Sequence, residues 1–282
     1  MIRTLYVSDL DGTLLRSDGT LSDESARLIN AAVEAGGLFT YATARSFSSS
    51  RRVTAQLRLA LPVATYGGAI MAHPETGAAI DVRLLANGVV HALVDAAEVD
   101  DTTAPVLHTF EDGTDWLRWN PHRRTSGIER FLSDRVGDRR LRPITRDDPV
   151  DTGSVFYISV LAARPALVSL RHRACAALNG VAQFLSADAH TPGHDWFELL
   201  SAEGTKAKAI RRLAASVDAD RVVVFGDNHN DVPMFDVADE GYAVANAVPE
   251  LRAIATKVLD HHDCDPVSRW IADDFARRSP PS

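Results

Sequence analysis

Cysteine is scarce in this sequence. Only two cysteines, Cys175 and Cys264, occur among 282 residues, and they lie far apart. A disulfide framework is therefore not expected, and a reducing cytoplasm fits this composition. The chain also shows no charged-then-apolar leader and no apolar run as long as a membrane span. These absences predict a soluble cytoplasmic protein without a membrane partner.

Basic charge is also in deficit. Lys and Arg number 30 against 38 Asp and Glu, so the formal net charge is −8. A general nucleic-acid-binding protein usually carries a basic domain or stripe, so this class is not expected. Hydrophobic residues make up 45% of the chain and charged residues 24%, which is ordinary for a globular protein. The length suggests one large or two ordinary domains.

Apolar runs of strand length alternate with helical patterns near both ends of the chain. Runs at 2–7, 38–42 and 62–66 have the composition of strands, and helical spacing of apolar residues separates them. A run at 221–225 is the most strongly β-branched in the chain. Alternation of strand and helix is typical of a parallel sheet, and it predicts an α/β fold.

The character of the sequence changes near residue 83. Strands in hairpin-like spacing, with helices between them, follow until the chain returns to the first pattern near Trp196. This arrangement predicts a separate α+β insert with an exposed loop at about 133–153. The predicted boundaries are 1–82 and 195–282 for the α/β part, and 83–194 for the insert.

Two carboxylates end the first predicted strand. Asp9 and Asp11 lie two residues apart, and Gly12 then lets the chain turn. Because side chains alternate in a strand, a regular strand would point both acids the same way. Buried carboxylates are costly unless they are paired, and a divalent cation pairs well because hard cations prefer oxygen ligands. The stretch therefore predicts a metal site, with a solvated strand-to-turn junction as the alternative.

Other polar residues stand where further apolar runs end. Thr43 follows the run at 38–42, Lys206 opens a helical pattern, and Gly-Asp-Asn-His-Asn-Asp at 226–231 follows the run at 221–225. Ligands of parallel sheets bind beyond the carboxyl ends of the strands. Each feature is weak alone, but together and in this order they indicate one site.

The order and spacing of these residues resemble the haloacid dehalogenase superfamily of phosphatases. The segment Asp9-Leu10-Asp11-Gly12-Thr13 is similar to the superfamily's first motif, Thr43 to its second, Lys206 to its third and 226–231 to its fourth. The long insert between motifs two and three resembles the Cof-like branch, which carries a large α/β (type 2) cap there. The resemblance covers nearly the whole chain. It implies a Rossmann-like parallel-sheet core with an inserted α+β cap that sets substrate specificity.

The resemblance also implies an activity. It implies a Mg²⁺-dependent phosphatase that hydrolyses small phosphate monoesters, such as sugar phosphates, through an aspartyl-phosphate. Asp9 would be the nucleophile and Asp11 the general acid and base. The implied metal ligands are Asp9, Asp11 through its backbone carbonyl, Asp227 and Asp231. The implied phosphate-binding residues are Leu10, Thr43, Ala44, Lys206 and Asn230. Arg45 is a candidate for substrate contact.

Two positions depart from the pattern of the branch. Ala44 stands where members often have Gly, and Gly67-Gly68 stands where an Asn-Gly pair is usual. A substrate contact by that Asn side chain is therefore not expected here. Neither departure affects the positions that carry the chemistry.

Several polar residues have a second interpretation. His229 is either a metal ligand or, as we favour, a solvent-side neighbour. The run His-His-Asp-Cys-Asp at 261–265 suggests zinc, but it lacks a second Cys/His pair, so a polar loop is favoured. Trp116 and Trp119 are candidates for lining a substrate pocket, but packing of one of them in the core of the insert is favoured. A basic group could bind a second anionic group of the substrate or lie in a solvated loop, and the solvated loop is favoured. The group is His122, Arg123 and Arg124.

Two other functions stay open at this stage. A sugar phosphomutase would also keep both Asp9 and Asp11, and turnover would then need a bisphosphorylated sugar. A catalytically idle binding protein can use the same fold, because fold does not decide function. The intact set of Asp9, Asp11, Lys206 and Asp227 argues against the idle protein. The motifs predict neither the individual substrate nor an oligomeric state.

Overall fold

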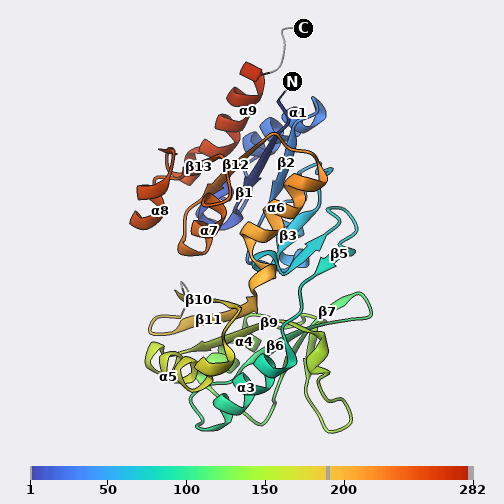
Figure 1. Cartoon of the computed structure of the whole chain (residues 1–282), viewed down its shortest axis with the longest axis vertical. Helices are drawn as coiled ribbons and strands as arrows, with labels where there is room; N and C mark the ends of the chain where they lie inside the picture. Colours follow the sequence, from blue (N-terminus) through green and yellow to red (C-terminus); the bar gives the residue numbers. More distant parts are fainter. Residues whose placement is uncertain (1, 189–190, 279–282) are drawn as a thin grey trace. The chain divides into compact units, whose positions relative to one another are not determined.

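The chain divides into two compact units in the computed structural model, which describes residues 2–188 and 191–278 (Figure 1). One unit, called the core unit here, contains residues 1–81 and 205–282, and the other, called the insert unit, contains residues 82–204. None of the helices in the described part of the chain has the length and apolar character that a membrane span needs.

A parallel sheet forms the centre of the core unit. Its strand order is β14-β13-β12-β1-β2, and every neighbouring pair runs parallel. The neighbouring strands β1 and β12 are buried along their whole length, as the apolar residues in the middle of each strand require. The strands are β1 (Thr4–Ser8), β2 (Leu38–Tyr41), β12 (Arg221–Gly226), β13 (Glu240–Ala243) and β14 (Lys257–Val258). A small sheet joins β3 (Val63–Thr65), β4 (Ile70–Ala72) and β5 (Ala79–Val82), and β3 and β4 pair antiparallel in it.

Helices connect the strands of the core unit, and several begin at a side-chain cap. The Ser22 hydroxyl accepts a hydrogen bond from the Ser25 N–H at the start of α1, and Thr205 caps α6 in the same way. Each cap satisfies a backbone donor that the helix itself leaves unpaired. The helices are α1 (Asp23–Glu34), α2 (Phe47–Val53), α6 (Lys206–Ser216), α7 (Val232–Phe235), α8 (Pro249–Ile254) and α9 (Pro266–Arg278).

The insert unit is built on a six-stranded mixed sheet. Its order is β10-β11-β9-β6-β7-β8, and only β7 and β8 pair in parallel. Apolar side chains of α3 (Asn87–Glu98) and α5 (Arg164–Ala174) share one buried cluster with the sheet, and those of α4 (Ser126–Ser133) share another. The strands are β6 (Val106–Glu111), β7 (Thr114–Trp119), β8 (Leu141–Pro143), β9 (Val155–Ala162), β10 (Val181–Ala187) and β11 (Asp195–Ser201). The predicted α/β fold with an inserted α+β domain is confirmed.

The return to the core unit lies later than the sequence pattern placed it. Strand β11 pairs with β9 and β10, and Phe197 and Leu199 on it join the apolar cluster of the insert unit. The structure therefore divides the chain at 204/205 rather than at 194/195. The apolar sequence of a strand does not determine which of two sheets the strand joins, because the sheet depends on the strands with which it pairs. Strand β8 also lies within the stretch 133–153, which was predicted to be a loop.

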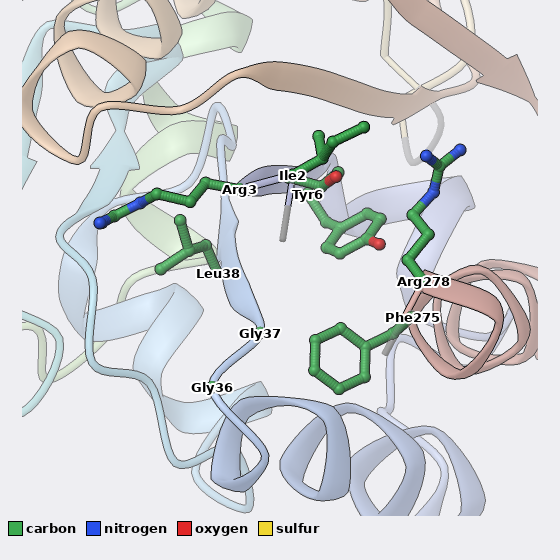
Figure 2. Close-up of a pocket in the computed structure, with 9 residues that line it drawn as sticks. Ile2, Arg3, Tyr6, Gly36, Gly37, Leu38, Phe275 and Arg278 are labelled. Carbon is green, nitrogen blue, oxygen red and sulfur yellow. The ribbon is translucent and has the colours of Figure 1, made fainter. Parts of the chain in front are cut away.

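A cavity of about 310 Å³ lies at the amino ends of the core strands. Thr4 and Leu38, which begin β1 and β2, line it together with Tyr6. Figure 2 shows Phe275 and Arg278 of α9 beside it. None of the predicted site residues lines this cavity, because those residues follow the opposite, carboxyl ends of the strands.

His108 makes the stability of the insert unit depend on pH. It is buried on β6, and its Nε2 atom lies 2.9 Å from Ser159 Oγ. Burial, together with the positive charges of Arg135 and Arg140, lowers its pKa from 6.5 to about 3. An unfolded chain binds the proton near pH 6.5, so stability falls as the pH drops from about 6.5 towards 3.

We expect His108→Gln to remove this pH dependence. Between pH 7 and pH 5, His108 should cost the wild-type insert unit about 2 kcal/mol of unfolding free energy, because its unfolded form gains a proton and its folded form does not. Urea unfolding at both pH values measures the difference. His122→Gln, at an exposed position, should behave like the wild type. An equal loss in wild type and His108→Gln would contradict the prediction.

Candidate active site

Two neighbouring parallel strands bring two carboxylates together. Asp9 follows β1, and its N–H donates to the Phe225 carbonyl on β12 at 2.9 Å, so the parallel pairing continues one residue beyond β1. Asp227 follows the last residue of β12. Because β1 and β12 are adjacent and parallel, their carboxyl ends meet at one edge of the sheet. The predicted meeting of these two motifs is present in the structure.

The cluster contains three carboxylates. Oxygen atoms of Asp9, Asp227 and Asp231 lie within 4.8 Å of one another. Asp9 is only 6% exposed and Asp231 is fully buried. Burial raises the pKa of Asp9 well above its usual range, and the negative charges of Asp231 and Asp227 raise it further, although the positive charge of Lys206 lowers it. Burial and the charge of Asp231 likewise raise the pKa of Asp227 to about 6. Carboxylates held this close need positive charge between them.

The chemistry of this donor set fits Mg²⁺. Mg²⁺ is a hard cation that is bound in proteins through one or two carboxylates with water in its remaining positions. The three acids offer only oxygen atoms, with no sulfur or nitrogen ligand that would favour zinc. Asn230, in the same loop, has a buried Oδ1 atom that accepts no hydrogen bond among the described residues.

Lys206 supplies positive charge inside the cluster. Its side chain is 3% exposed, and Nζ lies 2.6 Å from Asp9 Oδ1 and 2.7 Å from Asp231 Oδ1. Burial lowers its pKa, but the two carboxylates outweigh burial and hold the pKa above the usual range. Lys206 therefore stays charged. It is the first residue of α6, so a capped helix start fixes its backbone.

Asp231 organises the loop after β12. Its Oδ2 atom accepts hydrogen bonds from the N–H groups of Asp227 and Asn228, at 3.0 and 3.1 Å, while Oδ1 accepts from Lys206. One buried carboxylate thus fixes both the lysine and the backbone of a second acid. Asp231 was predicted as a metal ligand, and these contacts show that it also orders Lys206 and the backbone of the loop.

Asp11 does not continue the strand, so the expectation based on a regular strand is wrong. β1 ends at Ser8, and the chain turns through Leu10–Leu14 with Gly12 at φ 73°. The Asp11 side chain is 54% exposed, and its carboxylate accepts from Arg45 Nε at 2.7 Å and Nη2 at 2.5 Å. Asp11 is also not among the clustered carboxylates of the described residues. Arg45, which was predicted as a candidate for substrate contact, is the partner of Asp11 in this structure.

The turn after Asp9 packs directly against Asp227. Thr13 Oγ1 donates to Asp227 Oδ1 at 2.9 Å. A Cβ atom at Gly12 would lie 2.5 Å from Asp227 Oδ2, so only glycine fits both the positive φ and the close approach. Thr13 was part of the quoted motif, but its contact with Asp227 was not predicted.

The remaining predicted phosphate-binding residues follow β1 and β2. Thr43 is buried, and its Oγ1 accepts a hydrogen bond from the Arg45 N–H at 3.1 Å. Ala44 is exposed and Leu10 is buried. Because β1 and β2 pair in parallel, the segments that carry these three residues begin at the same edge of the sheet.

The Gly67-Gly68 pair joins two parts of the site. The Gly67 N–H donates to the Thr43 carbonyl at 2.9 Å. A Cβ atom at Gly68 would lie 2.5 Å from the Thr205 carbonyl and 2.7 Å from the Lys206 nitrogen. Both glycines have positive φ, 68° and 104°. The turn thus packs against the start of α6 at Gly68, which is also the glycine of the expected Asn-Gly pair, so this contact does not account for Gly67 in place of Asn.

We expect Gly68→Ala to displace Lys206. The positive φ alone costs about 1–2 kcal/mol for an alanine. The backbone clash should add a further 1–3 kcal/mol, as overpacking does, and it should lower activity because α6 must shift. Chemical denaturation and a phosphate-release assay measure both effects.

Gly36→Ala is the matched control for this prediction. Gly36 has a similar φ of 93°, but a Cβ atom there meets nothing within 4 Å. This variant should lose only the cost of the positive φ and keep its activity. Equal losses in the two variants would show that the contact with α6 does not matter.

The alternatives left open by the sequence are resolved by contacts. His229 is exposed and does not belong to the Asp9 cluster. Arg123 donates to the backbone carbonyls of Thr103 and Ala97, so its guanidinium stabilises the fold of the insert unit rather than binding an anion. Trp119 packs against the apolar cluster beside α4.

The segment 261–265 belongs to the core unit and contacts the chain just after the Leu10–Leu14 turn. Ligand atoms of His261, His262 and Asp263 lie within 4.8 Å of one another. His262 Nδ1 lies 2.6 Å from the Leu15 carbonyl, and Asp263 accepts hydrogen bonds from the Ser17 N–H and hydroxyl. These contacts favour the polar loop over the zinc site.

Comparisons with known proteins agree with this geometry. The family model for haloacid dehalogenase-like hydrolases matches residues 6–271. The chain is 26% identical over 292 residues to the 5-amino-6-(5-phospho-D-ribitylamino)uracil phosphatase YitU of Bacillus subtilis (strain 168), covering 96% of this chain and 97% of that protein. It is 23% identical over 288 residues to the pyridoxal phosphate phosphatase YbhA of Escherichia coli (strain K12), covering 96% and 98%. Among solved structures, BT1666 from Bacteroides thetaiotaomicron shares the fold with a TM-score of 0.76 at 19% identity, covering 98% of this chain and 96% of that one.

Proposed function

Because the chain belongs to the haloacid dehalogenase-like hydrolases, we propose that it is a Mg²⁺-dependent phosphatase of small phosphate monoesters. The observation that carries the proposal is the buried cluster of Asp9, Asp227 and Asp231 with Lys206 inside it. A purely structural ion pair rarely needs three carboxylates for one lysine, because burying unpaired charge is costly. The excess negative charge supports a cation-binding and phosphate-binding role.

Mg²⁺ would be held by Asp9 and Asp227, with the Asp11 backbone carbonyl as a further proposed ligand. When bound, the ion would neutralise negative charge on the phosphoryl group and on the acids around it. Asp231 is already engaged by Lys206 and by two backbone N–H groups, so its contribution is to hold these partners in place.

Asp9 is the proposed nucleophile. Its carboxylate oxygen forms a bond to phosphorus while the bond from phosphorus to the leaving oxygen breaks, which produces an aspartyl-phosphate and an alcohol. Asp11 gives its proton to the leaving oxygen and then takes one from water, which attacks phosphorus and releases phosphate from Asp9. Lys206, Thr43 and the N–H groups of Leu10 and Ala44 are proposed to bind the phosphoryl oxygens.

Arg45 limits what Asp11 can do in the resting enzyme. Both carboxylate oxygens of Asp11 accept from the Arg45 guanidinium. Asp11 must loosen this pairing before it can carry a proton to the leaving oxygen. Substrate binding is the proposed trigger, because an anionic phosphate near Arg45 competes for the guanidinium.

Small phosphorylated metabolites are the proposed substrate class. The names of the relatives describe phosphatases of a phosphorylated ribitylaminouracil and of pyridoxal phosphate. The insert unit is proposed to act as a cap that excludes bulky phosphoproteins and sets specificity. The cytoplasm remains the proposed location, in line with the few cysteines.

Phosphate release tests the proposal. The purified protein is assayed with p-nitrophenyl phosphate and a panel of sugar and vitamin phosphates, with Mg²⁺ or with a chelator. Turnover that needs Mg²⁺ supports the phosphatase. Turnover that occurs only with a bisphosphorylated sugar would favour the phosphomutase, and no turnover with any compound would overturn the proposal.

A further inference from the structure

Asn246 joins two segments of the core unit through its side chain. It lies between β13 and α8, and its Nδ2 atom donates to the Gly12 carbonyl at 2.7 Å. Its Oδ1 atom accepts from the His262 N–H at 3.3 Å. Because a backbone N–H only donates, this contact assigns the oxygen end of the amide and directs the NH₂ group to Gly12. Asn246 therefore fixes the Gly12–Thr13 peptide.

The same short segment also holds the second carboxylate loop. The Val248 N–H donates to the Asp227 carbonyl at 2.8 Å. Thr13 Oγ1 in turn donates to Asp227 Oδ1 at 2.9 Å. The contacts close a ring that runs from Gly12 through Asn246 and Val248 to Asp227, and back through Thr13. The turn at Gly12 and the Asp227 side chain are closely packed within this ring, because a Cβ atom at Gly12 would lie only 2.5 Å from Asp227 Oδ2.

His262 anchors this ring to the rest of the fold. Its imidazole is buried, with Nδ1 2.6 Å from the Leu15 carbonyl, while its backbone N–H donates to Asn246. The neighbouring Asp263 binds Ser17. His262 and Asp263 thus hold both Asn246 itself and the chain that follows Gly12, at Leu15 and Ser17.

We infer that Asn246 is a positioning residue for the metal-binding carboxylates. It has no described contact with Asp9 or with the carboxylate oxygens of Asp227, and it acts by holding the Gly12 peptide against Asp227. The inference rests on the proposed Mg²⁺ site. Without the Asn246 amide, the Gly12–Thr13 turn relaxes, and Asp227 loses its fixed distance to Asp9. Cation binding should weaken more than folding does.

The test is direct binding of Mn²⁺, a carboxylate-binding stand-in for Mg²⁺, followed by loss of the electron paramagnetic resonance signal of the free ion. We expect Asn246→Ala to bind Mn²⁺ about 3–10-fold more weakly than wild type, which corresponds to one lost neutral hydrogen bond. Asn246→Ser, too short to span both partners, should show the same loss. The Mg²⁺ concentration for half-maximal phosphate release should rise by a similar factor.

Asn30→Ala is the matched control. The Asn30 amide also bridges two backbone groups, because it donates to the Gln56 carbonyl and accepts from the Arg58 N–H, both at 2.8 Å. This variant removes the same kind of contact in the same unit, outside the ring. It should lose a similar amount of stability and bind Mn²⁺ like the wild type.

The outcomes separate the two claims. Wild-type Mn²⁺ binding in both Asn246 variants would overturn the positioning role while leaving the metal site intact. Equal weakening in Asn30→Ala would also overturn it, because the effect would then follow stability. A wild-type protein that binds no Mn²⁺ would overturn the metal site itself, and the inference with it.

Discussion

Asp9→Asn should reduce kcat for phosphate release by at least about 10³-fold at saturating Mg²⁺. An amide oxygen is a poor nucleophile, so the bond to phosphorus no longer forms at a useful rate. The fold should survive the change, because Lys206 keeps its bond to Asp231 and the Asn oxygen still accepts from Nζ. The initial rate with the best substrate of the panel measures the effect.

The stability of this variant makes the test specific. Burial raises the pKa of Asp9, which means that the folded protein disfavours its charged form. A neutral Asn should therefore leave the unfolding free energy unchanged or raise it. Asp23→Asn, at an exposed acid in the first turn of α1, serves as a control and should keep full activity. More than a tenth of the wild-type rate in Asp9→Asn would exclude Asp9 as the nucleophile.

Lys206→Met should be the most destabilising of the substitutions considered. Removal of the ammonium leaves Asp9 and Asp231 buried without their shared partner. Removing one member of a buried ion pair typically costs 3–5 kcal/mol, so we expect a loss of about 3–5 kcal/mol of unfolding free energy. The rate of phosphate release should fall at least about 10²-fold, because charge neutralisation at the phosphoryl group is lost.

Added Mg²⁺ should restore part of that stability, since a cation among the carboxylates replaces some of the missing charge. Denaturation with and without Mg²⁺ measures the recovery. Lys257→Met, at an exposed position on β14 of the same unit, is the control and should behave like the wild type in both measurements. A Lys206→Met protein as stable as the control would show that the cluster does not need the ammonium.

Asp11 and Arg45 show where local reasoning failed. The alternation argument assumed that β1 continues to Asp11, but the chain leaves the strand after Ser8 and turns at Gly12. The partner of Asp11 is 34 residues away in sequence, and it reaches Asp11 from the segment after β2. A sequence pattern describes neighbours along the chain, whereas this pair depends on how the two loops pack.

The sequence by itself determined the parallel α/β core, the inserted domain and the three strand ends at which the site forms. These features follow from apolar runs and from the polar residues that end them, and both are local. Only the tertiary structure decided that β11 joins the insert sheet, that Gly68 packs against α6 and that Asn246 holds Gly12. Each of these depends on contacts between residues from 8 to more than 200 positions apart. Such contacts form only after the core has packed, because the packing of the core determines which loops lie next to each other.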